Sequence, residues 1–151
     1  MTTTLNSNPR NVDNLERQEQ IQVVTFDFNL TSGTDFVVGG LPPGAMVIGI
    51  VAYVVTAFNA GTTNTLNVGI TGTTAYYVSA ASITAQQVTP LTLAATAVPL
   101  ASATNLTVRF TQSGGAATTG VCTLVIRYVV PRGNLTAPGG ATLNLSGVAT
   151  A

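Results

Sequence analysis

The sequence contains no lysine, no histidine and no tryptophan, and only ten of its 151 residues are charged. Charged residues make up 7% of the chain, whereas about 25% is usual for a soluble domain. Without histidine there is no Ser-His-Asp or Cys-His machinery and no imidazole ligand for a metal. Without lysine there is no Walker A loop, no Schiff base and no lysine-rich nucleic-acid surface. We therefore predict a non-enzymatic protein without catalytic residues, cofactor or metal, and without nucleic acid as a partner.

Uncharged residues supply the polarity of this chain, which contains 26 threonines. Its hydrophobic content is 46% and its mean hydropathy is +0.43, which argues against disorder because disordered chains have low hydrophobicity. Threonine is β-branched, so it favours a pleated, half-buried surface and weakens helices. The composition predicts an all-β protein.

The ten charges are unevenly distributed along the chain. Five of them lie in the first nineteen residues, and no charge occurs in the 73 residues from Phe36 to Val108. A monomer with so few charges would have little protection against aggregation. We therefore expect other subunits or another protein to cover much of the surface. The alternative is a monomer kept soluble by hydroxyl and amide groups.

One apolar run, residues 45–58, has to be tested as a membrane segment. It is fourteen residues long, short of the roughly twenty that a spanning helix needs, and it is rich in valine and isoleucine, as buried strands are. The first ten residues contain no apolar stretch typical of a secretory signal. We expect no membrane partner, and synthesis in the cytoplasm.

Period-2 alternation of apolar residues predicts several strands. In residues 21–30 one face carries Val24, Phe26, Phe28 and Leu30. Residues 46–58 are apolar on both faces, which predicts a central strand with one face on the core and the other against a neighbouring subunit or sheet. Pro90 and Pro99 confine their segment to a sheet edge or an extended connection. Residues 106–111 and 120–130 are predicted to form a hairpin.

About eight strands without a convincing helix in the body make a β-sandwich, of the jelly-roll kind, the best architecture. Three regions are expected: an extended N-terminal arm (1–20), the sandwich (21–131) and a C-terminal extension or last strand (132–151). The arm can form one short helix at most, which would become ordered only against a partner. A frayed terminus without a role is the alternative.

The carboxylates, the cysteine and two of the arginines of the body each have a structural explanation. Asp27 and Asp35 are its only carboxylates, and a solvated strand face and a turn account for them. Cys122 lies within an apolar run and is expected to be a small buried hydrophobe. Arg109 and Arg127 could face one another across the predicted hairpin, where a carboxylate such as Asp27, or one from a partner, would have to separate them. Asp27, Arg109 and Arg127 are thus candidates for an ion pair or an oligomer contact.

Residues 21–72 resemble small structural proteins of tailed bacteriophages. The likeness lies in a first strand, a Gly/Pro turn (GGLPPG), a long apolar strand ending in TAF, an Asn/Gly turn and a short LNVGI strand. The pattern is similar to that of capsid decoration, or cement, proteins, many of which are sandwich or jelly-roll modules that trimerise on the outside of the head.

This resemblance implies a virion protein on the capsid surface that reinforces the lattice by bridging major capsid subunits. It would act as a homo-oligomer, with a trimer favoured, and the major capsid protein would be its partner. The arm is where we expect lattice contact, through Arg10, Asp13, Leu15, Glu16 and Arg17. The alternative is a module of a tail or head fibre that recognises host surface glycans, for which an exposed aromatic platform would be needed.

Overall fold

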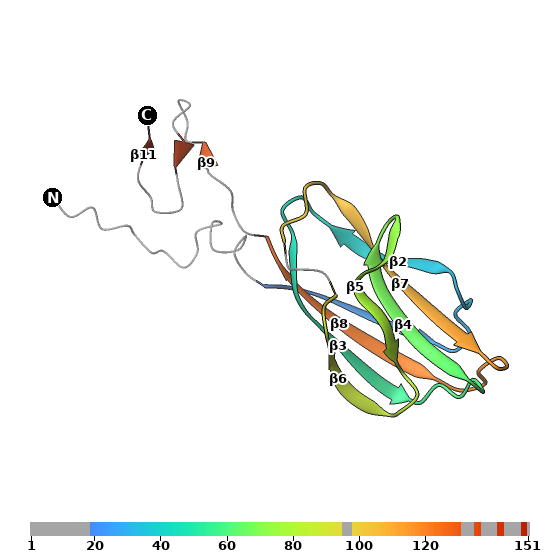
Figure 1. Cartoon of the computed structure of the whole chain (residues 1–151). Coiled ribbons are helices and arrows are strands. Elements are labelled where there is room, and N and C mark those ends of the chain that lie inside the picture. Colours follow the sequence, from blue (N-terminus) through green and yellow to red (C-terminus); the bar gives the residue numbers. More distant parts are fainter. Residues whose placement is uncertain (1–18, 95–97, 131–134, 137–141, 144–148, 151) are drawn as a thin grey trace.

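Eight strands form two four-stranded antiparallel sheets that pack against each other (Figure 1). The computed structural model describes residues 19–94 and 98–130, and the backbone of three short strands beyond them. The first sheet has the order β1 (Gln20–Asp27), β8 (Val121–Val129), β3 (Met46–Thr56) and β6 (Gln87–Leu91). The second sheet has the order β2 (Asp35–Leu41), β7 (Thr104–Ser113), β4 (Thr63–Ile70) and β5 (Thr73–Ser82).

The connections between these strands follow a jelly-roll path. Only β4 and β5 are neighbours both in sequence and in a sheet, and every other connection among the eight strands crosses to the opposite sheet. Eight antiparallel strands in the orders 1-8-3-6 and 2-7-4-5 are the interlocked Greek keys of a jelly roll. The predicted all-β sandwich is therefore confirmed, and β3 is an interior strand as expected.

Two local predictions are wrong. Residues 106–111 and 120–130 do form strands, but β7 and β8 belong to different sheets, so they are not a hairpin. The link between them contains two consecutive glycines with positive φ, Gly114 and Gly115, and it carries the chain across the sandwich. The Gly/Pro turn (GGLPPG) was expected to end the strand before Gly39. Instead β2 continues through Gly39 and Gly40, with a bulge between Val37 and Gly39 that absorbs the irregularity.

The core lies between the sheets and is filled by the inward residues of the alternating pattern. Its aromatic centre is a triangle of Phe26, Phe58 and Phe110, with ring centroids 4.9 to 6.5 Å apart. Burying each such side chain stabilises the fold by about 1.5–3 kcal/mol. Gly120 adjoins this triangle with φ of +146°, and a Cβ at this position would overlap the Phe58 ring.

The sheet edges on the two sides of the sandwich are protected differently. Pro90 lies in edge strand β6, as predicted, and it removes one backbone donor from that edge. On the opposite side, the Gln22 amide of edge strand β1 donates to the Gly40 carbonyl of edge strand β2 at 2.9 Å. This contact ties the two sheets together along one side.

Both ends of the sandwich sequence leave it at the same place. Gln20, the first residue of β1, is paired with Tyr128 near the end of β8. Beyond β8, the backbone forms a small antiparallel sheet of β9 (Leu135–Thr136), β10 (Thr142–Leu143) and β11 (Ala149–Thr150). These short strands lie within residues 132–151, where a C-terminal extension or last strand was expected. The boundaries of the arm and of the C-terminal extension stay predictions.

Candidate interaction surface

Arg109 forms a bidentate ion pair with Asp35 on the outward side of the second sheet. The two residues face each other in the register of β7 and β2, and the guanidinium donates hydrogen bonds of 2.8 and 2.9 Å to the two carboxylate oxygens. The Thr74 hydroxyl donates a third bond to Asp35, at 3.0 Å. The hydrogen bond from Arg109 is the main cause that holds the pKa of Asp35 below its usual value.

Arg127 forms the second ion pair, with Glu19 at the start of the described chain. Its guanidinium donates through Nε to one carboxylate oxygen and through Nη2 to the other, the latter at 2.9 Å. This hydrogen bonding lowers the pKa of Glu19 and raises that of Arg127. Neither Glu19 nor Asp35 was predicted as the partner of an arginine, because register between distant strands is not visible in the sequence.

The predicted arrangement of Asp27 between two facing arginines is wrong. Arg109 lies on β7 and Arg127 on β8, in opposite sheets, and each has its own carboxylate. Asp27 instead accepts hydrogen bonds from the backbone N–H and the side-chain amide of Asn29, at 2.9 and 3.2 Å. This local pattern ends β1 in an Asx-type turn. The arm candidates Arg10, Asp13, Leu15, Glu16 and Arg17 lie outside the described residues.

The outward side of the first sheet is apolar, and we call it the apolar face. Residues that are paired across neighbouring strands form rows on this face. The central row has one apolar residue from each of the four strands, and the next row adds the large apolar side chains of Tyr53 and Val88. The face consists of Ile21, Val23, Val51, Tyr53, Val55, Val88, Pro90 and Val125. Val23 and Val88, on the two edge strands, are each more than 60% exposed. The sequence indicated this face only at residues 46–58, since residues 21–30 appeared polar on their outward side.

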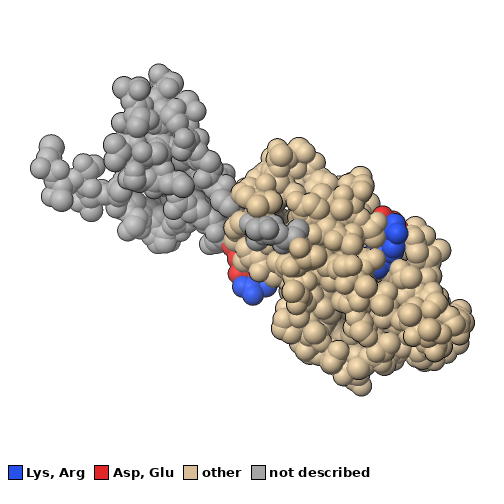
Figure 2. Space-filling view, viewed as in Figure 1, with Lys and Arg blue, Asp and Glu red and all other residues tan. Residues whose placement is uncertain are grey.

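The outward side of the second sheet is polar, and we call it the polar face. Besides the Arg109–Asp35 pair, Asn67 accepts a hydrogen bond from the Ala80 backbone N–H at 2.5 Å, and Thr65 is paired with Thr111. Val37 is its large exposed aliphatic residue. On the side seen in Figure 2, charged atoms occur in small groups and the rest of the visible described surface is uncharged. The two faces therefore differ in apolarity, and the charges near them are few: the Arg109–Asp35 pair on the polar face, and the Arg127–Glu19 pair and Asp27 beside the apolar face.

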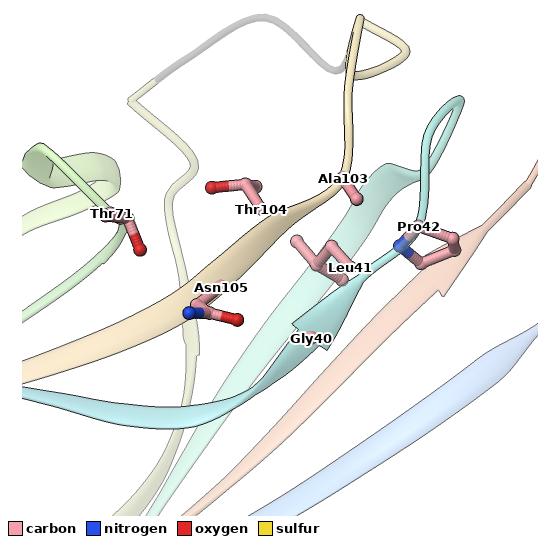
Figure 3. A pocket seen from close by; sticks show the side chains of 7 residues that line it. All are labelled: Gly40, Leu41, Pro42, Thr71, Ala103, Thr104 and Asn105. Atoms are coloured by element: carbon pink, nitrogen blue, oxygen red, sulfur yellow. The ribbon is translucent and has the colours of Figure 1, made fainter.

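A shallow, open hollow of about 610 Å³ lies where β2 ends and β7 begins. Figure 3 shows its lining: Gly40, Leu41, Pro42, Thr71, Ala103, Thr104 and Asn105. The lining offers two threonine hydroxyls and one amide, but no ionisable and no aromatic side chain. It therefore lacks the convergent polar groups and aromatic walls typical of small-molecule sites.

The described residues contain no cluster of acidic or sulfur ligands that could hold a metal ion, and they contain no helix that could span a membrane. Cys122 is fully buried in β8. Burial raises the pKa of its thiol to about 12, so the nucleophilic thiolate is suppressed. It fills space in the core, as the sequence indicated.

The tyrosines of the described chain do not form an exposed aromatic platform. Tyr76 and Tyr77 contact each other edge to face, with ring centroids 4.9 Å apart. Tyr77 is buried in the core, and desolvation raises its pKa to about 12. Tyr53 alone among the described tyrosines is exposed. The arrangement expected for a glycan-binding module is absent from this part of the chain.

No protein-family model matches this sequence, and no curated protein matches it either. Among solved structures, the chain is similar to one in the capsid asymmetric unit of cyanophage Pam1, with 21% identity and a TM-score of 0.58 over 76% of this chain and 86% of that one. A chain in the acid-stable capsid of Helicobacter pylori bacteriophage KHP30 matches with 18% identity and a TM-score of 0.57, over 76% and 89%. A chain in the capsid of Ralstonia phage GP4 matches with 20% identity and 0.53, over 76% and 86%. At these identities the likeness establishes a shared fold, and all three structures are phage capsids.

Proposed function

We propose that this protein is a non-enzymatic structural component of a phage virion. It binds the outside of the capsid and reinforces the lattice by bridging major capsid subunits, acting as a homo-oligomer with a trimer favoured. The three similar structures support this proposal, since each is a capsid and the match covers 86% or more of each similar chain. Those chains therefore consist mainly of the same sandwich.

The observation that carries the proposal is the near-absence of free charge on the sandwich. Five charged residues occur in the described chain, and four of them are closed into two bidentate ion pairs. Burying an unpaired charge in an interface costs several kcal/mol. A surface whose charges are already paired can be covered on several sides at a low cost in desolvation, and this suits a protein held in a dense lattice.

We place the contact with the capsid on the N-terminal arm, through Arg10, Asp13, Leu15, Glu16 and Arg17. This region holds half of the chain's charges in the first nineteen residues. Charged groups favour fast, oriented association with a complementary surface, which the neutral sandwich cannot provide. Because β1 begins beside the end of β8, the arm and the C-terminal extension both leave that one end of the sandwich, which we propose faces the lattice.

Binding to heads tests this function directly. Purified protein is mixed with tail-less heads that lack it, from the phage that encodes it, and the heads are sedimented through a cushion. We expect saturable binding with a fixed ratio to the major capsid protein, and heads that resist heat or chelators better than bare heads. Failure to bind, combined with recovery of the protein on purified tails, would contradict the proposal. A glycan array would then test the fibre module that is the alternative.

A further inference from the structure

We propose that the apolar face is the surface through which copies of this chain bind one another. The occupant is a second copy of the chain, and the choice of that occupant rests in part on the proposed function. The sequence predicted only that other subunits or another protein would cover much of the surface. The proposal names the side chains that make the contact between copies.

The geometry of the face favours packing of one protein surface on another. Val23, Val125, Val51 and Pro90 occupy one register row across β1, β8, β3 and β6, and the adjacent row contains Thr25, Thr123, Tyr53 and Val88. Such a continuous apolar band on a monomer marks an interaction surface or an aggregation liability. The polar face offers the matched contrast, since its corresponding rows hold the Arg109–Asp35 pair and threonines.

Charge favours a second copy over a charged partner. Two charged residues lie on the outward side of the first sheet, on either side of its two central rows: Arg127, which Glu19 neutralises through two hydrogen bonds, and Asp27, whose carboxylate accepts hydrogen bonds from Asn29. The two central rows of the face thus contain no charged residue with which to attract or orient a charged foreign surface. Two copies that meet through these two rows bring no like charges together, and interfaces between identical subunits are the most apolar class.

The time at which the face is covered also favours a second copy. A protein that binds the outside of an assembled head must first remain dissolved without it. An exposed apolar band would promote aggregation during that interval. Another copy is present at equal concentration from synthesis onward, so self-association would cover the band before any capsid is met.

The size of the face is sufficient for the centre of such an interface. Four strands at about 4.8 Å spacing and about seven residues at 3.3 Å rise give a footprint of roughly 450 Å² per copy, or 900 Å² for a pair. Specific interfaces bury upwards of about 1,000 Å² in total. Projecting side chains and a polar rim add to the footprint, so the apolar face can form the core of a stable contact.

Val23 and Val37 provide a matched pair for the test. Each is a valine on an edge strand and each is 62% exposed, but Val23 lies on the apolar face and Val37 on the polar face. We expect the full-length wild-type chain to sediment as an oligomer at micromolar concentration. V23R, and V88R at the other edge of the face, should raise the dissociation constant at least about a hundredfold, because an unpaired charge is then buried. V37R should sediment like the wild type.

Each result decides for or against this assignment. Circular dichroism and thermal melting first establish that V23R and V88R are folded; if one is not, the milder V23T and V88T replace them, with V37T as control. Dissociation of the apolar-face variants alone supports the proposal. It is overturned by a monomeric wild type, by V23R and V88R that remain oligomeric, or by V37R that dissociates equally. Binding of the wild type to heads is measured separately, so a failed proposed function would be recognised independently of the self-association result.

Discussion

The guanidinium of Arg109 donates two parallel hydrogen bonds to the carboxylate of Asp35, which fixes β7 to its edge neighbour β2 on the polar face. Both side chains are about one-third exposed, so solvent weakens the attraction and the pair contributes no more than about 1 kcal/mol. Because these hydrogen bonds favour the ionised form of Asp35, the stability that the pair contributes depends on pH.

Acid should weaken the fold partly through Asp35. Its pKa in the folded protein lies below the ordinary value of 3.8, so the folded state holds this proton less tightly than the unfolded chain. The stabilisation is complete above about pH 4 and is lost as the pH falls through the folded pKa. Asp35→Asn should therefore reduce the free energy of unfolding at pH 7 and flatten its decline below pH 4, as measured by urea denaturation at several pH values. Arg109→Gln should have the same effect, and an unchanged acid slope in both variants would contradict this.

Gly120 should tolerate no side chain. Its positive φ and the ring of Phe58 both oppose a Cβ, so Gly120→Ala should lower the free energy of unfolding by about 3 kcal/mol through strain and overpacking. Gly72 also has a positive φ, but open space surrounds it. Gly72→Ala should cost only about 1 kcal/mol. Equal losses in thermal or denaturant unfolding would show that the contact with Phe58 is unimportant.

Cys122 should be inert in the folded protein. Because the thiol is fully buried and its pKa is raised to about 12, a disulfide reagent at pH 8 should label it only after denaturation. Cys122→Val, which keeps the site apolar and adds little volume, should change stability by less than about 1.5 kcal/mol. Rapid labelling of the native protein would contradict the packing described for β8.

Removal of residues 1–18 should separate folding from capsid binding. The truncation retains Glu19 and its contact with Arg127, so the sandwich should melt within a few degrees of the full-length protein. Binding to heads in the sedimentation assay should be lost. A full-length control with Arg10, Asp13, Glu16 and Arg17 replaced by Gln or Asn keeps the length and removes the charges. If the truncated protein coats heads with full affinity, the arm hypothesis is wrong.

The sequence predicted the strands better than their partners. Alternation identified the inward face of β1 at Val24 and Phe26, because a dry face imposes a two-residue period locally. Pro90 indicated an edge strand because its missing N–H is a local property. The link at residues 114–120 indicated a reversal, but the same turn residues serve a hairpin and a crossing between sheets. The ion pairs depend on register between residues 74 and 108 positions apart, and no local pattern reports that register.

The apolar face could not be predicted from the sequence for the same reason, because it depends on which strands are neighbours. Val23 and Val88 are separated by 65 residues in the sequence, and each alone is an ordinary exposed valine. Only the strand order β1-β8-β3-β6 places them on one surface with Val51 and Val125. The scarcity of charge indicated that some surface would be covered, and the topology identifies which one is suited to it.

The number of copies in the intact particle tests the central claim most directly. Quantitative mass spectrometry of purified virions, calibrated with labelled peptides of this chain and of the major capsid protein, gives that ratio, and separated heads and tails give the location. A protein that bridges capsid subunits should be present in hundreds of copies, in a simple ratio to the major capsid protein, and on heads alone. A handful of copies, or recovery with the tails, would contradict the account.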